Sequence, residues 1–139
     1  MRVTFDTETI RFITLFENLT GATVKDCLSD EKNVYLVIDE GKVGLAIGKN
    51  GSNVKYVESM LNKNIKIFEF SSNTVTFVKN LIPEITEIKI KNSSGEETVV
   101  EVRVGKRKRA MIIGREGKNL KLYKNLLQRT HGVADLIVR

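Results

Sequence analysis

The sequence predicts an α+β fold that is built twice, as two similar units in tandem. Segments with apolar residues at helical spacing are mixed with short segments in which apolar and polar residues alternate. The motif Ile-Gly-x-x-Gly occurs at 47–51 and returns at 113–117, and the first glycines are 66 residues apart (114 minus 48). In both copies an apolar pair leads into Gly-x-x-Gly and an amphipathic segment follows it, so we predict the order α-β-β-α-α-β in each unit.

The first half opens with a helix over about 8–19, where apolar residues recur at helical spacing. Asp6 is a candidate N-cap, and Gly21 is a suitable C-terminal stop. Strands are predicted over 22–29 and 33–39, because both are rich in β-branched and apolar residues and a polar turn separates them.

A short helix over about 42–47 then leads into the first glycine loop. The helix after this loop carries Val54, Val57 and Leu61 on one face, at i, i+3 and i+7. Alternation over 65–70 predicts the strand that closes the first unit.

The same pattern restarts at Ser71-Ser72-Asn73, a candidate cap for a helix that runs to about Leu81. Pro83 prevents this helix from continuing. Alternating residues over 84–91 predict a strand, and the polar sequence 92–95 predicts a turn after it.

A second strand is predicted over 99–104, followed by a basic run and the second glycine loop. Beyond that loop we predict a helix over about 118–129 and a final strand over 133–138. The 66-residue offset places Val34 on Val100, and about three extra residues near 130–132 are needed before the last strand. We therefore interpret the chain as an internal duplication with domains at 1–70 and 71–139.

Charge differs between the two halves. Residues 1–70 hold 9 Lys and Arg against 10 Asp and Glu, whereas residues 71–139 hold 14 against 7, so the net charges are −1 and +7. Ten of the basic residues lie within 103–129, where Glu116 is the single acid. A basic cluster around a glycine loop suits a polyanionic partner such as nucleic acid.

Each glycine loop has the features of a phosphate-binding turn. Without Cβ atoms, glycine lets phosphate oxygens approach the backbone and adopts positive φ freely. The helix that follows directs free N–H groups and the positive end of its dipole to the same place. Lys49 and Arg115 stand in the middle of the loops and can each meet a phosphate.

Other functional classes find little support. The spacing Gly44-x3-Gly48-Lys49-Asn50 does not match a P-loop, and a dinucleotide-binding fingerprint is absent. The single cysteine, Cys27, and the single histidine, His131, give no metal cluster and no catalytic pair, so we expect no enzyme, no cofactor and no metal. No apolar run approaches the length of a membrane span, and we expect a cytoplasmic protein with neither a membrane nor a small-molecule substrate as partner.

The sequences Ile47-Gly48-Lys49-Asn50-Gly51 and Ile113-Gly114-Arg115-Glu116-Gly117 resemble the signature of KH domains. The element order is similar to the type II KH topology, in which the last strand completes a three-stranded sheet packed by helices. A tandem pair in a chain of this length resembles the archaeal NusA-like family of transcription termination and antitermination factors.

This resemblance implies a function in transcription, with single-stranded RNA as ligand and RNA polymerase as a further partner. KH loops clamp the backbone of about four nucleotides, and apolar residues beside the loop then lie under the bases. The residues expected to contact RNA are Ile47, Gly48, Lys49, Asn50, Gly51, Val54, Lys106, Arg107, Lys108, Arg109, Ile113, Gly114, Arg115, Glu116, Gly117, Lys118, Leu120 and Lys121.

Two alternatives remain open at this stage. A ribosome-associated or rRNA-binding KH protein would bind structured rRNA and sediment with ribosomal particles. An adaptor that docks on RNA polymerase would use the near-neutral first half, and charge reversal within residues 1–40 would then abolish polymerase binding without loss of RNA affinity.

Overall fold

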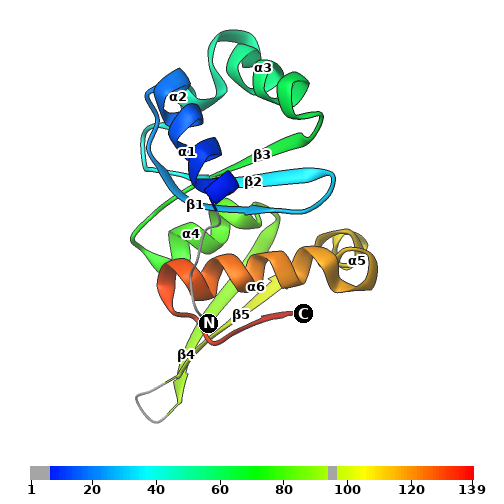
Figure 1. The fold of residues 1–139 in the computed structure, drawn as a ribbon. Coiled ribbons are helices and arrows are strands. Elements are labelled where there is room, and N and C mark those ends of the chain that lie inside the picture. Colours follow the sequence, from blue (N-terminus) through cyan, green and yellow to red (C-terminus); the bar gives the residue numbers. More distant parts are fainter. Residues whose placement is uncertain (1–6, 94–96) are drawn as a thin grey trace. The chain divides into compact units, whose positions relative to one another are not determined.

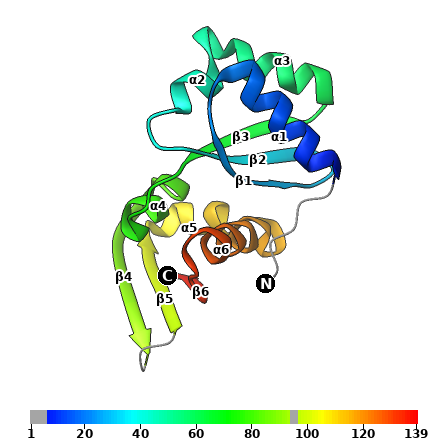
Figure 2. The same cartoon turned by 60° about the vertical axis from the view of Figure 1, so that its left-hand side comes forward.

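The computed structural model describes residues 7–93 and 97–139 of the chain (Figures 1 and 2). The chain divides into two compact units, a first unit over Arg2–Ser71 and a second unit over Ser72–Arg139. Both are mixtures of helices with one sheet each, which confirms the α+β prediction.

The first unit has the predicted order of elements. They are α1 (Thr7–Thr20), β1 (Val24–Ser29), β2 (Asn33–Ile38), α2 (Val43–Ile47), a 3-10 turn (Lys49–Gly51), α3 (Ser52–Leu61) and β3 (Asn64–Glu69). The candidate N-cap Asp6 lies outside the described residues. Gly21 follows α1 at φ 76° and donates its N–H to the carbonyl of Glu17, as expected of a C-terminal stop.

The sheet of the first unit has the order β1-β2-β3. The strand β2 pairs with β1 in antiparallel and with β3 in parallel orientation, and it is buried from Val34 to Ile38 as the central strand. The helices α1, α2 and α3 lie on one face of this sheet (Figures 1 and 2). Phe16, Ala46 and Val57, one from each helix, pack with Leu36 of β2 in the core.

The second unit repeats this order. Its elements are α4 (Thr74–Leu81), β4 (Ile85–Ser93), β5 (Glu97–Val104), α5 (Lys106–Ile113), a 3-10 turn (Arg115–Gly117), α6 (Lys118–His131) and β6 (Asp135–Val138). Its sheet has the order β4-β5-β6, with an antiparallel pair followed by a parallel pair. The strands β4 and β5 form a long hairpin beside the short β6 (Figure 2), which pairs only with Val99–Val102.

Two local predictions for the second unit have different outcomes. The predicted cap of α4 is confirmed at Asn73, whose side chain accepts a hydrogen bond from the N–H of Thr76 at 3.0 Å. The predicted turn over 92–95 begins too early, because β4 continues to Ser93 through its pairing with Glu97. Residues 94–96 lie outside the described part of the chain.

Strand register shows that the predicted insertion before the last strand is too short. Val34 pairs with Ile65 in the first unit, and Val100 pairs with Leu136 in the second. The offset is therefore 66 at the central strand (100 minus 34) and 71 at the last strand (136 minus 65), which gives five extra residues rather than three. Most of them lengthen the helix after the loop, since α3 has 10 residues and α6 has 14.

Candidate nucleic-acid interface

The two glycine loops, Gly48–Gly51 and Gly114–Gly117, have nearly the same backbone. The first glycines have φ and ψ of 78° and 170° in one loop and 79° and 167° in the other. The third residues, Asn50 and Glu116, have 55° and 29° against 57° and 25°. The last glycines have 74° and 18° against 73° and 18°, so no angle differs by more than 4°.

The first glycine of each loop is required by both conformation and space. A Cβ on Gly48 would lie 2.8 Å from Cγ of Asn53, and a Cβ on Gly114 would lie 2.8 Å from Cγ of Asn119. Positive φ with ψ near 170° is a region that essentially glycine alone occupies. Loop geometry at this position therefore depends on glycine for two independent reasons.

One asparagine in each unit, Asn53 or Asn119, holds the two sides of its loop together. The Asn53 side chain donates from Nδ2 to the carbonyl of Leu45 at 3.0 Å, and Asn119 donates from Nδ2 to the carbonyl of Met111 at 3.2 Å. Each bond ties the helix after the loop to the helix before it. Sequence reasoning missed both residues, although they are the same amino acid at the 66-residue offset (119 minus 53).

The middle of each loop faces solvent. Lys49, Asn50, Arg115 and Glu116 are all exposed. In each loop the last glycine has a left-handed conformation and comes directly before the helix α3 or α6, whose first N–H groups have no partner within the helix. Each loop thus presents exposed polar side chains, including one cation, beside the N-terminus of a helix.

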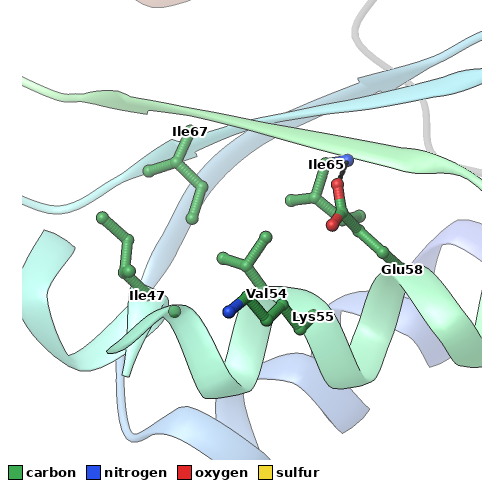
Figure 3. A pocket seen from close by; sticks show the side chains of 7 residues that line it. Ile47, Val54, Lys55, Glu58, Ile65 and Ile67 are labelled. Atoms are coloured by element: carbon green, nitrogen blue, oxygen red, sulfur yellow. Dashed lines mark hydrogen bonds between the residues drawn. The ribbon is translucent and has the colours of Figure 1, made fainter. Parts of the chain in front are cut away.

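An apolar groove of about 370 Å³ adjoins the first loop (Figure 3). It is lined by Ile47, Gly51, Val54, Lys55, Glu58, Ile65 and Ile67. The predicted wall residues Ile47 and Val54 are therefore both present. The opposite wall comes from β3, where Ile65 and Ile67 are two residues apart and so face the same side of the strand.

A charged hollow of about 540 Å³ adjoins the second loop. It is lined by Arg115, Glu116, Lys118 and Lys121, so four of the predicted residues gather there. The predicted apolar residues Ile113 and Leu120 are half-buried and do not line it. The two loops are alike in backbone and different in the surface beside them.

The basic run Lys106–Arg109 forms the first turn of α5, and all four side chains are exposed. Cations are unfavourable at this end of a helix, because the dipole there is already positive. Arg109 donates from Nη2 to the carbonyl of Val138 at 3.4 Å, which directs its guanidinium to the end of β6. Lys106, Arg107 and Lys108 are the members of the run that face solvent without such a contact in the described residues.

Lys55 is a further cation beside the first loop that sequence reasoning did not single out. Its Cε lies 3.8 Å from the position that a Cβ on Gly51 would take, so the side chain runs back toward the loop. The signal was available, since Lys55 corresponds to Lys121 at the 66-residue offset (121 minus 55). Lys55 thus supplies the first loop with a second positive charge, after Lys49.

The single cysteine and the single histidine pack against other residues of the fold. Cys27 is buried, with 4% of its surface exposed. His131 ends α6, where its ring stacks on Phe77 at 4.7 Å and its Nδ1 lies 2.7 Å from Oγ1 of Thr130. Within 7–93 and 97–139, no cluster of His, Cys, Asp and Glu could hold a metal ion, and no helix is long and apolar enough to cross a membrane.

Comparison with known proteins gives a consistent result. A family model described as KH domain matches residues 12–92. The probable transcription termination protein NusA of Methanococcus vannielii is 39% identical over 140 residues, which cover 99% of this chain and 80% of that protein. The protein of the same name from Halococcus morrhuae is 31% identical over 98% of both chains.

A solved structure agrees in both fold and sequence. The crystal structure of APE1850 is 32% identical and has a TM-score of 0.78, covering 97% of this chain and 100% of that one. The family match spans more than half of the chain, and the archaeal relatives match it from end to end. The chain therefore belongs to the KH-domain family, in the group of archaeal NusA-like proteins.

Proposed function

We propose that the protein is an RNA-binding transcription factor whose two units, 1–70 and 71–139, are tandem type II KH domains. The observation that carries this proposal is the near identity of the two loops, whose dihedral angles agree within 4° at every position given above. In both loops an asparagine packs against the first glycine, and an exposed cation follows that glycine. Loops that only turned the chain would not need both features twice.

Each loop would clamp the backbone of single-stranded RNA. The glycines let a phosphate approach, and the N-terminal N–H groups of α3 and α6 supply hydrogen-bond donors with a favourable dipole. Lys49 and Lys55 would neutralise phosphates at the first loop. Arg115, Lys118 and Lys121 would do so at the second, and the exposed basic run would add affinity without reading sequence.

The role in transcription rests on the relatives. Those from Methanococcus vannielii and Halococcus morrhuae are named probable transcription termination proteins. By analogy, this chain would bind the nascent transcript and modulate elongation, termination or antitermination, with RNA polymerase as its partner.

Binding of short single-stranded RNA over a series of salt concentrations tests the loops. The variants are Lys49→Asp/Asn50→Asp, Arg115→Asp/Glu116→Asp and all four substitutions together. We expect each pair to weaken binding about tenfold or more and the combination to remove it. Equal RNA affinity in all variants would show that the loops are only turns.

A matched control is available at the other end of α3. Asn62 has φ 56°, like Asn50 in the loop, and Lys63 is its neighbour. The variant Asn62→Asp/Lys63→Asp makes the same change in charge and in backbone preference as the first loop variant, so it should leave RNA affinity unchanged. The same set of proteins, added to transcription by a purified archaeal RNA polymerase, should change the terminated fraction only where RNA binding is intact.

A further inference from the structure

We infer that Glu58 makes the groove of the first unit favour bases that carry an exocyclic amino group, such as cytosine, over bases that carry a carbonyl there, such as uracil. This inference rests on the proposed function. Glu58 lies on α3 and lines the groove at the end opposite Ile47 (Figure 3).

One oxygen of this carboxylate is already used. Oε2 of Glu58 accepts a hydrogen bond from the N–H of Ile65 at 2.9 Å (Figure 3). This bond fixes the side chain against β3, the edge strand of the sheet. The other oxygen, Oε1, has no hydrogen-bond partner in the described part of the chain.

The groove offers few other polar groups. Ile47, Val54, Ile65 and Ile67 are apolar, and the Lys55 side chain runs back toward Gly51 and the loop. Glu58 is therefore the only side-chain acceptor among the lining residues. A flat base that enters an apolar groove must satisfy its polar edge, because a buried polar group without a partner costs free energy.

The backbone of β3 adds a donor next to this acceptor. Since the N–H of Ile65 bonds to Glu58 and not to β2, Ile65 directs its backbone polar groups to the open edge of the sheet. In a parallel pair the direction alternates, so Ile67 directs its N–H to the same edge. The groove thus presents a donor from Ile67 and an acceptor from Glu58 on one side.

This pair of groups matches cytosine better than uracil. A carboxylate accepts hydrogen bonds and cannot donate them, and it pairs well with the N4 amino group of cytosine. Uracil has a carbonyl oxygen at that position, which would face the negative charge of Glu58. Adenine has an amino group like that of cytosine. Guanine could be held by two carboxylate oxygens, but here Ile65 occupies one of them.

The second unit provides an internal contrast. The position equivalent to Glu58 is Lys124 (58 plus 66), whose Nζ forms an ion pair with Oδ1 of Asp135 at 3.0 Å. Asp135 also accepts the N–H of Leu136 at 2.9 Å, the residue equivalent to Ile65 in the sheet register. A cation thus replaces the acceptor, so the proposed selectivity belongs to the first unit alone.

The test compares octamers of cytidylate and uridylate at pH 7.5 with the full chain. We expect cytidylate to bind about five- to tenfold more tightly, the discrimination expected of one well-placed hydrogen bond. In Glu58→Gln the amide oxygen can keep the bond from Ile65, while the amide nitrogen faces the groove as a donor. The ratio should then fall to about one or reverse in favour of uridylate.

Glu17 is a matched control. Its Oε2 accepts the N–H of Val24 at 2.9 Å, seven residues along the chain, at the other edge strand of the same sheet. Glu17→Gln makes the same chemical change outside the groove, so it should leave the ratio unchanged. A ratio that survives in Glu58→Gln, or that changes equally in Glu17→Gln, would overturn the inference.

Two further outcomes separate the inference from the proposed function. If the parent binds neither octamer, the proposed function fails; if it binds both equally, only the selectivity fails. Should Glu58→Gln not fold, the amide NMR signal of Ile65 in the parent gives the answer. It should shift more on adding the cytidylate octamer than the uridylate octamer, and equal shifts would contradict the role of Glu58.

Discussion

The two loops share a backbone but stand in different surroundings. Beside Gly48–Gly51 lies an apolar groove with one carboxylate, and beside Gly114–Gly117 lies a hollow lined by three cations and Glu116. The units also differ in net charge, −1 for residues 1–70 and +7 for residues 71–139. At the 66-residue offset, Gly48, Gly51 and Asn53 correspond to identical residues, whereas Asn50, Ser52 and Glu58 correspond to Glu116, Lys118 and Lys124.

This difference suggests distinct contributions to RNA binding. An apolar groove can receive a base and discriminate among bases, because its polar groups are few and fixed. A hollow lined by three cations attracts phosphate, which carries no sequence information. The comparison therefore predicts that the first unit determines which RNA sequence is preferred. The second unit should determine how strongly RNA affinity depends on salt concentration.

The largest expected effect is a loss of stability on replacing the first glycine of either loop, a residue that the two units share. Gly48→Ala and Gly114→Ala should each destabilise their own unit by about 1–3 kcal/mol, because they combine a clash with a conformation that only glycine adopts readily. Gly51→Asn and Gly117→Asn should cost much less, since asparagine tolerates the left-handed conformation and no atom lies within 3.4 Å of the added Cβ.

Hydrogen exchange measured unit by unit would show these losses, with the two asparagine variants as controls. We expect the two alanine variants to lose similar protection, because the loop angles and the contact to asparagine are the same in both units. If Gly48→Ala lowered protection in its unit and Gly114→Ala left protection unchanged, the loops would be less alike than their geometry indicates.

A smaller effect should separate the units by their response to salt. Lys118→Ala/Lys121→Ala removes two cations from the hollow, and each phosphate contact contributes about 0.7 to the slope of log affinity against log salt for single strands. We expect the slope to decrease by about 1.4 with no change in base preference. Lys55→Ala in the first unit should reduce it by about 0.7.

The measurement is RNA affinity at four or more salt concentrations for each variant. Lys79→Ala is a suitable control, since this exposed lysine lies in the last turn of α4 and lines neither the groove nor the hollow. Equal slopes for the parent and for Lys118→Ala/Lys121→Ala would refute a role for the hollow in phosphate binding.

Much of the fold could be predicted because the signals are local. Helical spacing, alternation and the repeated Gly-x-x-Gly motif are properties of short segments, and they located most helices and strands in the described residues to within a few positions. The helix α5 was expected from the order of elements, but its range was not predicted, because its first four residues are all basic. The five-residue insertion was underestimated because the extra turn of α6 continues the helical pattern of the residues before it. Only the pairing of β5 with β6 reveals its length.

The site could be predicted less completely, since parts of it depend on contacts between distant segments. Ile47 and Val54 flank the loop in sequence, but Ile65 and Ile67 join the groove only because β3 pairs with β2. Asn53 was overlooked because its role is a hydrogen bond to a carbonyl eight residues earlier. Glu58 acquires a fixed orientation only from the backbone of Ile65.

The smallest expected effect distinguishes β5 from β2 by its dependence on pH. Glu101 on β5 forms an ion pair with Lys91 at 2.8 Å and accepts a hydrogen bond from Nε of Arg139. These two partners, Lys91 first, lower the pKa of Glu101 below its usual value. The equivalent residue of the first unit is Tyr35 (101 minus 66), which brings no carboxylate to that position.

A carboxyl group with a lowered pKa stabilises the folded state above its unfolded pKa, and this contribution is lost as the pH falls through the folded value. The second unit should therefore lose protection from hydrogen exchange on β5 as the pH drops below about 4.5, the usual range for glutamate, before the first unit does so on β2. Glu101→Gln should remove this part of the pH dependence, whereas Glu87→Gln, whose partner Arg103 lies on the exposed surface, should change it little. If β2 and β5 lose protection together in the parent, the ion pairs of Glu101 do not set the acid response, and the two sheets are alike in this respect although Tyr35 stands where the second sheet has Glu101.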